Sequence, residues 1–441
     1  MQFIASPLVF FTTDGQDDGL VRENAMSKPS DYSLTDQAVQ ECPYDFYAAM
    51  RREAPVYQMP ETGFYIVSRY GDLQAVLKDT KTFSNAAQPA QQRQLQREKS
   101  AVQVMYEEEG WVPTPSLQRT DPPLHSRYRQ PIDKTFTASR VRDMTPYIDG
   151  IVTDLIDDLV VLGQDGQQVD FVQHFAIPLP CRVIADQFGV PRADVPKLKL
   201  WSDALMDSFG MMMDAKRERE IATQILEAQK YFAAAFEERY DKPRNDMLSD
   251  LIRTPEGAKP LTMNELLDMM MQLLTGGNDT TTGSLAEGLL LMIRNPDQVQ
   301  LLRDQPGRMK NFVEEVLRVE SPVQGLLRVT TRDVELGGTL IPADSVVIVR
   351  YASANRDEAK FDDAEKLDVC RKNAGAHLAF GAGIHFCPGA MLARQELNSA
   401  FTQILDRLDD IQLAVPDASL SHHPSMLHRR LVSLPITFIA K

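Results

Sequence analysis

The sequence has few cysteines and no excess of positive charge. Its four cysteines among 441 residues show no C-x-x-C spacing; they are Cys42, Cys181, Cys370 and Cys387. A disulfide framework and a zinc site are therefore not indicated, and a reducing cytoplasm is expected. Asp and Glu outnumber Lys and Arg by 62 to 47, giving a formal net charge of −15. This balance argues against an extended nucleic-acid surface, which needs clustered cations.

Long apolar runs, internal repeats and linkers are also missing. The longest N-terminal apolar stretch, residues 3–11, is too short to span a bilayer and lacks a basic flank, which predicts a soluble protein without a membrane anchor. No repeat and no Gly/Ser or Pro linker divides the chain, so a single domain over residues 26–441 is expected. We expect residues 1–25 to lie outside that domain, with Met26 as the candidate natural start.

The residues that are present predict a mainly α protein with a minor β-sheet. Apolar residues recur with helical spacing at 155–160, at 221–232 and in a long run from Thr262 to about Arg294. That run opens with a capping box, Thr262-x-x-Glu265. Strand patterns cluster at 63–69 and at 334–351, where Gly337 and Gly338 mark a hairpin turn.

A glycine-rich stretch surrounds Cys387 and is followed at once by a helical pattern. This order predicts that the sulfur lies at a helix N-terminus, where unpaired N–H groups and the helix dipole favour a thiolate. Such a thiolate ligates a metal or attacks an electrophile. Glycines on both sides let the backbone approach a flat ligand closely. A buried structural cysteine after a Gly-rich turn is the alternative for an isolated cysteine.

The long helical run contains an alcohol next to an acid, Thr280 after Asp279, preceded by Gly276 and Gly277. Glycines and β-branched threonines oppose helix formation, and such a conflict favours a functional distortion. The glycines would let a ligand lie against the helix, and the alcohol and carboxylate would deliver protons. A flexible helix packed through small residues is the alternative.

Three motifs together resemble the cytochrome P450 superfamily. The pattern F-G-x-G-x-H-x-C-x-G runs unbroken from Phe380 to Gly389, fixes six of ten positions, and resembles the family's haem-binding loop. Residues 276–280 are similar to its oxygen-activation motif, (A/G)-G-x-(D/E)-T. Glu315 and Arg318 are similar to its E-x-x-R pair, and all three occur in the family's order. The resemblance runs from about residue 43 onward and implies a helical bundle around haem with a long central helix.

The resemblance also implies roles for individual residues. Cys387 would be the axial ligand of the haem iron, Thr280 would hydrogen-bond dioxygen, and Asp279 would relay protons. The residues that would contact haem b are His125, Arg129, Arg328 and His377 at the propionates, and Phe380, Gly381, Gly389, Gly276 and Gly277 elsewhere.

Beneath the haem, Glu315 and Arg318 would lock the core. Lys366 stands where the family's third member of that network is an arginine, with Arg356 as a further contributor. His385 is interpreted as a packing or loop hydrogen-bonding residue.

The function implied by the resemblance is that of a haem-thiolate monooxygenase. Only 54 residues follow Cys387 and no flavin or iron–sulfur motif appears, so electrons from NAD(P)H would arrive through a ferredoxin and its reductase. These would dock on a basic patch near the cysteine, composed of Arg127, Arg129, Lys134, Arg371, Lys372 and Arg394. A monomer is expected.

Methionines and the aligned substrate-contacting segments imply an apolar pocket. These segments are residues 200–214, 270–277, 323–327 and 426–427. The substrate would be a small hydrophobic molecule of terpenoid, steroid, fatty-acid or aromatic type. A peroxide-driven haem-thiolate peroxygenase and a non-catalytic haem-binding sensor are the alternatives.

Overall fold

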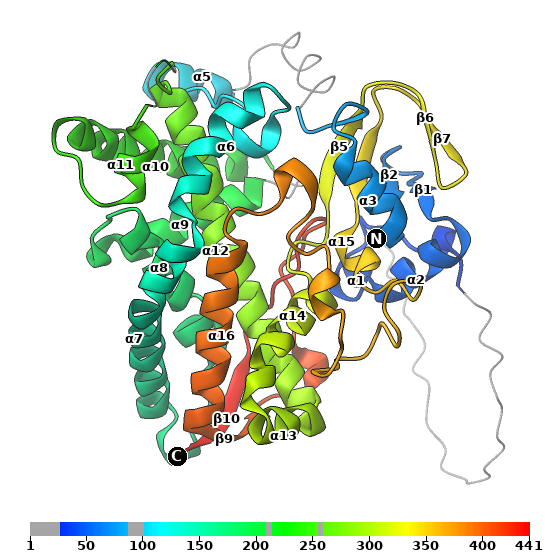
Figure 1. The fold of residues 1–441 in the computed structure, drawn as a ribbon, viewed down its shortest axis with the longest axis vertical. Coiled ribbons are helices and arrows are strands. Elements are labelled where there is room, and N and C mark those ends of the chain that lie inside the picture. Colours follow the sequence, from blue (N-terminus) through cyan, green and yellow to red (C-terminus); the bar gives the residue numbers. More distant parts are fainter. Residues whose placement is uncertain (1–26, 87–100, 209–213, 255–256, 258) are drawn as a thin grey trace, which may run out of the picture.

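The computed structural model describes residues 27–86, 101–208, 214–254, 257 and 259–441. The expected extension at 1–25, Met26 and the methionines at 211–213 lie outside the described residues. The α-helices are α1 (Gln37–Glu41), α2 (Tyr44–Glu53), α3 (Tyr70–Lys78), α5 (Ala101–Glu109), α6 (Leu124–Thr135), α7 (Ala138–Leu162), α8 (Pro178–Gln187), α9 (Val195–Ser208), α10 (Ala215–Asp241), α11 (Met247–Ile252), α12 (Met263–Arg294), α13 (Pro296–Asp304), α14 (Met309–Glu320), α15 (Tyr351–Ala354) and α16 (Ala390–Arg407). The prediction of a mainly helical protein is confirmed (Figure 1).

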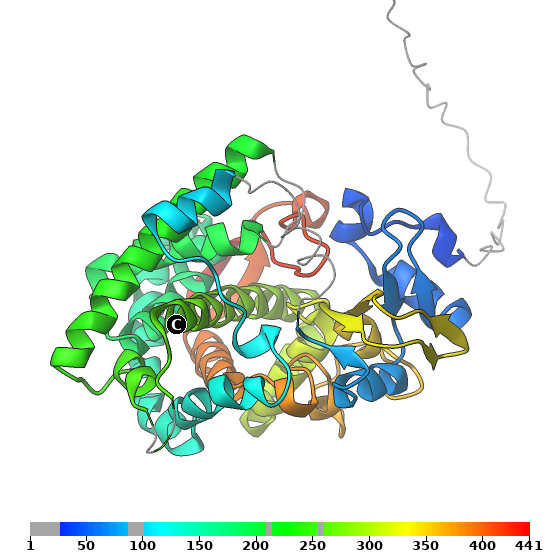
Figure 2. The ribbon, with the colours of Figure 1, turned by 90° about the horizontal axis from the view of Figure 1, so that it is seen from above.

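The longest helix is α12, and it is central to the helical part of the molecule (Figures 1 and 2). The predicted capping box is present, with Thr262 accepting from the Glu265 N–H and Glu265 accepting from the Thr262 N–H. The distortion expected at the threonines and glycines is absent, because helix runs unbroken through these residues. Thr275 and Thr280 donate their hydroxyls to carbonyls one turn earlier, both at 2.8 Å, so these polar groups are satisfied inside a regular helix.

Two apolar clusters bury α12 along its length. Its C-terminal half packs with α7, α14 and α16 in one cluster, and its N-terminal half packs with α8, α9, α10 and α11 in another. This burial on several sides offsets the poor helix propensity of the glycines and threonines. The central helix is therefore a rigid support for any site along its exposed stretch.

The β-strands lie in a five-stranded sheet in the order β1-β2-β8-β5-β3, a three-stranded sheet in the order β4-β10-β9, and the β6–β7 hairpin. The strands are β1 (Val56–Gln58), β2 (Tyr65–Val67), β3 (Phe83–Ser84), β4 (Val169–Asp170), β5 (Leu326–Thr330), β6 (Val334–Leu336), β7 (Thr339–Ile341), β8 (Val346–Val349), β9 (Leu408–Leu413) and β10 (Pro435–Ala440). The hairpin predicted at Gly337 and Gly338 is confirmed, since both have positive φ angles, 55° and 77°. The sequence patterns missed β1, β3, β4, β5, β9 and β10, and β3 and β4 have only two residues each.

Within the described ranges, no helix has the length and apolar character needed to cross a membrane.

Candidate active site

The glycine-rich segment before α16 forms a loop that presents Cys387. Gly381 and Gly383 have φ angles of 70° and 69°, which glycine adopts without steric cost. The Cys387 N–H donates to the Phe380 carbonyl at 2.9 Å, and Gly389 is the N-cap of α16. The predicted position of the sulfur at a helix N-terminus is therefore confirmed.

Opposing effects act on the proton of the Cys387 thiol. Burial raises the pKa of this thiol, while the N–H groups of Gly389 and Ala390 and the charges of Arg129 and Arg394 lower it. The net direction is upward, so without a metal this thiol holds its proton more firmly than an ordinary cysteine does. A coordinated metal cation reverses this balance, because a ligating thiol loses its proton. The sulfur and its surrounding donors thus fit a metal better than they fit a free nucleophile.

Below this loop, the Glu315–Arg318 pair is fully buried. The Nε and Nη2 atoms of Arg318 donate to the two carboxylate oxygens of Glu315 at 2.6 Å and 3.0 Å, and both side chains are 0% exposed. The third member of the network is Arg371, whose Nε lies 3.0 Å from Glu315 Oε1. Arg371 was predicted to belong to an exposed basic patch, and its burial corrects that prediction.

Lys366, the residue expected at the third position, contributes through its backbone. Its carbonyl accepts hydrogen bonds from Arg318 at 2.8 Å and from Arg371 at 3.2 Å. Its ammonium is 75% exposed beside Asp363. Arg356 lies next to the network, with its Nε donating to the Val319 carbonyl at 3.0 Å. The guanidinium that the local motif lacks is supplied by a residue five positions further along the chain.

Four side chains with N–H groups lie near one another beside the cysteine loop: His125, Arg129, Arg328 and His385. The sequence interpretation did not count His385 among them. His125 and His385 have ring centroids 4.3 Å apart. Burial, together with the charges of His125, Arg328 and Arg129, lowers the pKa of His385 to about 3. Among the described residues, His385 Nε2 is buried without a hydrogen-bond partner. An excess of donors of this kind suits an anionic ligand, and the two propionates of haem are such groups.

His377 and Phe380 lie in a different group of contacts. His377 Nε2 is 3.1 Å from Glu314 Oε2, and Arg394 Nε is 2.6 Å from Glu314 Oε1. Although burial opposes it, hydrogen bonds from His377 and Arg394 lower the pKa of Glu314 to about 2. The Arg394 guanidinium lies 4.6 Å from the centroid of the Phe380 ring. His377, which was predicted to bind a propionate, is therefore hydrogen-bonded to the Glu314 carboxylate.

The two glycines of α12 face different surroundings. A Cβ at Gly276 would meet nothing within 4 Å, so this glycine borders open space. A Cβ at Gly277 would lie 3.0 Å from Ile184 Cδ1 on α8. Gly276 fits the predicted approach of a flat ligand to the helix, whereas the missing side chain of Gly277 makes room for Ile184.

Asp279 is buried and both of its carboxylate oxygens have partners. Ser202 Oγ donates to Oδ2 at 2.7 Å, and Arg430 Nη1 is paired with Oδ1. Arg430 also lies 3.5 Å from Asp203. Burial raises the pKa of Asp279, although the charges of Arg430 and Lys199 oppose this shift. The arrangement links a buried carboxyl group next to Thr280 with partly exposed charged groups.

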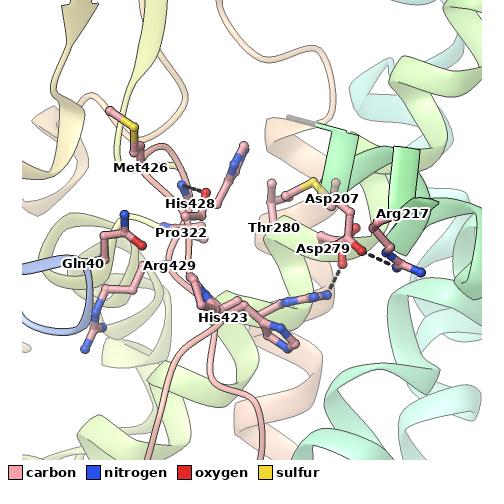
Figure 3. A pocket seen from close by; sticks show the side chains of 14 residues that line it. Gln40, Asp207, Arg217, Asp279, Thr280, Pro322, His423, Met426, His428 and Arg429 are labelled. Carbon is pink, nitrogen blue, oxygen red and sulfur yellow. Dashed lines mark hydrogen bonds and ion pairs between the residues drawn. The ribbon is translucent and has the colours of Figure 1, made fainter. Parts of the chain in front are cut away.

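A cavity of about 300 Å³ lies at Asp279 and Thr280 (Figure 3). Ten of its fourteen lining residues are polar or charged, yet most of the surface that they present to the cavity is apolar. Met206 and Met426 supply apolar surface from two of the regions expected near a substrate, and Pro322 adds to it from the residue before a third. The remaining walls come mostly from residues 423–430, near the C-terminus.

The surface around the cysteine loop is less basic than predicted. Arg127 pairs with Glu265, and Arg129 Nε lies 2.6 Å from Asp133. Apolar side chains of this part of the chain are exposed: Ile384 (39%), Phe386 (42%) and Met391 (43%). This face is therefore a mixed surface in which apolar groups lie among paired charges.

The sequence interpretation missed the roles in the site of three residues: His385, Arg371 and Arg430. His385 was detectable, because it is a fixed position of the loop pattern. Arg371 and Arg430 carry no local signal, since each reaches its carboxylate from a segment distant in sequence.

Comparison with known proteins agrees with this geometry. The family model "Cytochrome P450" matches residues 43–305 and 308–417. Cytochrome P450 107B1 of Saccharopolyspora erythraea is 33% identical over 410 residues, covering 91% of this chain and 96% of that protein. Cytochrome P450 monooxygenase PikC of Streptomyces venezuelae is 34% identical over 402 residues, covering 89% and 90%. The crystal structure of CYP109E1 from Bacillus megaterium with testosterone matches with a TM-score of 0.76 at 30% identity, covering 90% of this chain and 99% of that one.

Proposed function

Because the chain belongs to the cytochrome P450 family and is a monooxygenase of that family, we propose that Cys387 ligates the haem iron and that the enzyme hydroxylates a small organic molecule held beside Thr280. The observation that carries this proposal is the placement of the Cys387 sulfur at the N-terminus of α16. The N–H donors of the side chains around His385 and the open space at Gly276 agree with a haem next to that sulfur. When bound, the haem supplies the activation of dioxygen.

The chain's own residues would bind the haem and supply protons at the cavity. Arg129 and Arg328 would neutralise the propionates, and His125 and His385 would donate hydrogen bonds to them. The Thr280 hydroxyl, which donates to the Gly276 carbonyl at 2.8 Å, holds a proton at the edge of the cavity.

Asp279 accepts protons from the partly exposed groups around Arg430 and passes them toward Thr280. Its raised pKa favours this role, because a carboxyl group that holds its proton nearer neutral pH is a better donor.

Electrons come from separate proteins in this proposal. No flavin or iron–sulfur motif occurs in the sequence, so a ferredoxin and its reductase, fed by NAD(P)H, are the proposed donors. The mixed surface at Ile384, Phe386 and Met391 is the proposed docking face, because it overlies the cysteine loop. We place the enzyme in the cytoplasm as a monomer, with residues 26–441 as one domain.

The test is the difference spectrum of the dithionite-reduced protein with and without carbon monoxide. Wild type and Cys370→Ser should show the strongly red-shifted Soret band of thiolate ligation, because Cys370 is exposed and outside the loop. Cys387→Ser should lose that band. A wild-type band at the position typical of histidine ligation would refute the assignment of Cys387.

A further inference from the structure

A histidine side chain that makes no hydrogen bond or ion pair with the described residues lines the cavity next to Thr280. The backbone of His428 forms an isolated antiparallel bridge with Val323, and its backbone N–H donates to Ser425 Oγ at 3.2 Å. Its imidazole makes no hydrogen bond or ion pair with any described residue. In Figure 3 the ring points from the C-terminal segment into the space facing α12.

The fixed charges on the cavity wall already have partners. Arg217 is paired with Asp207 at 2.5 Å, and Arg430 is paired with Asp279. Arg429 Nη1 lies 2.6 Å from Glu320 and 3.1 Å from Glu287. Among the described lining residues, an anionic ligand would therefore find no unpaired cation, and a cationic ligand would find no unpaired carboxylate.

The His428 ring is itself uncharged near neutral pH. Burial and the charges of Arg430 and Arg350 lower its pKa to about 4. A neutral imidazole offers one N–H donor and one nitrogen acceptor. It therefore complements a hydroxyl group, which donates and accepts, or a carbonyl group, which accepts.

We propose that His428 is a specificity-determining residue that hydrogen-bonds a neutral hydroxyl or carbonyl group of the substrate. The hydrocarbon body of that substrate lies against Met206, Pro322 and Met426. This inference rests on the proposed function and narrows the substrate to uncharged amphipathic molecules. A pure hydrocarbon would desolvate the imidazole without giving it a partner, and so would bind less tightly.

The experiment uses the haem-loaded protein and four probes with one carbon skeleton. They are adamantane, 1-adamantanol, 2-adamantanone and 1-adamantanecarboxylate. Dissociation constants are measured by calorimetry and by the substrate-induced shift of the Soret band. Wild type should bind the alcohol or the ketone about tenfold more tightly than the hydrocarbon and more tightly than the acid.

Variants identify the group responsible. His428→Phe should weaken binding of the preferred oxygenated probe about 3- to 10-fold and leave adamantane unchanged, whereas His428→Gln should retain part of the preference. The control His174→Phe replaces an exposed histidine away from the cavity and should match wild type.

Three results would overturn the inference: equal binding of hydrocarbon and oxygenated probes, preference for the acid, or an unchanged His428→Phe. Absence of binding by both neutral oxygenated probes would overturn it as well. The carbon monoxide spectrum of the same samples tests the proposed function separately, since the calorimetric comparison does not depend on the ligand of the iron.

Discussion

At the scale of single residues, the hydroxyl and the carboxylate of α12 are held in different ways. Thr280 bonds its own helix and borders the cavity. Asp279 turns both oxygens to partners on other segments, Ser202 and Arg430. Proton transfer between the two groups therefore requires Asp279 to exchange one of these partners.

Replacing Thr280 by alanine should separate electron consumption from product formation. Loss of the hydroxyl removes the proton donor at the cavity, so NAD(P)H oxidation should continue while the yield of hydroxylated product falls roughly tenfold and peroxide accumulates. The measurement is the ratio of product to NAD(P)H consumed. Thr275→Ala is the matched control, since Thr275 makes the same bond to its preceding turn at 2.8 Å. Unchanged coupling in Thr280→Ala would contradict the assignment.

At the scale of elements, α14 is tied to the segment before the cysteine loop by buried charge. Glu315 is 0% exposed and accepts from Arg318 of its own helix and from Arg371. A buried carboxylate that loses a partner keeps its desolvation cost. Two arginines and one carboxylate thus join the helix to the loop that carries Cys387.

Arg371→Gln should lower the free energy of unfolding by about 3 kcal/mol, because it leaves Glu315 with one cation and removes bonds to loop carbonyls. Lys366→Gln, at the position of the expected third member, should change it by less than about 0.5 kcal/mol, because that ammonium is exposed. Denaturant unfolding of the haem-loaded protein gives both values. Equal losses in the two variants would contradict the assignment of Arg371, rather than Lys366, as the third member of the network.

Packing between α12 and α16 leads to a prediction for a glycine. A Cβ at Gly288 would lie 2.3 Å from Phe401 Cζ, and Phe401 is 0% exposed. Gly288→Ala should therefore destabilise the fold by about 1–3 kcal/mol through overpacking. Gly276→Ala on the same helix has open space around the added methyl group and should not destabilise the apoprotein. Urea unfolding of both apoproteins distinguishes them, and a loss of similar size in Gly276→Ala would contradict the open space assigned there.

At the scale of the whole molecule, the core contains an ionisable group that the mechanism does not use. Glu396 on α16 is 2% exposed, and its Oε2 has no partner among the described residues. Burial raises the pKa of this carboxyl group from the ordinary glutamate value of 4.5 to about 8. The native state therefore holds a proton that the unfolded chain releases at lower pH.

Stability should consequently fall as the pH rises from about 4.5 to 8. Across this range the native state binds more protons than the unfolded state, so the slope of the unfolding free energy against pH is negative for this group. Glu396→Gln should flatten that dependence and unfold at a higher temperature than wild type at about pH 8. Thermal unfolding at about pH 6 and about pH 8 tests this, with Glu335→Gln at an exposed site as the control. An unchanged pH dependence in Glu396→Gln would show that the carboxyl group is ionised in the native protein.

The sequence alone determined what depends on residues near one another along the chain. The capping box of α12, the turn at Gly337 and Gly338, and the loop that places Cys387 at a helix N-terminus follow from backbone preferences within a few residues. These local signals also carried the family resemblance, because its motifs are short and contiguous.

The tertiary structure decided what depends on segments far apart in sequence. It supplied Arg371 to Glu315, placed Arg430 on Asp279 across 151 residues, and brought charged residues from the C-terminal segment into the wall of the cavity. It also kept α12 regular where local propensity predicted a distortion, because burial of the helix outweighs the cost of its glycines and threonines. The partners of a buried charge are the groups that lie next to it in the folded core. Periodicity and spacing along the chain do not predict which distant segments come together there.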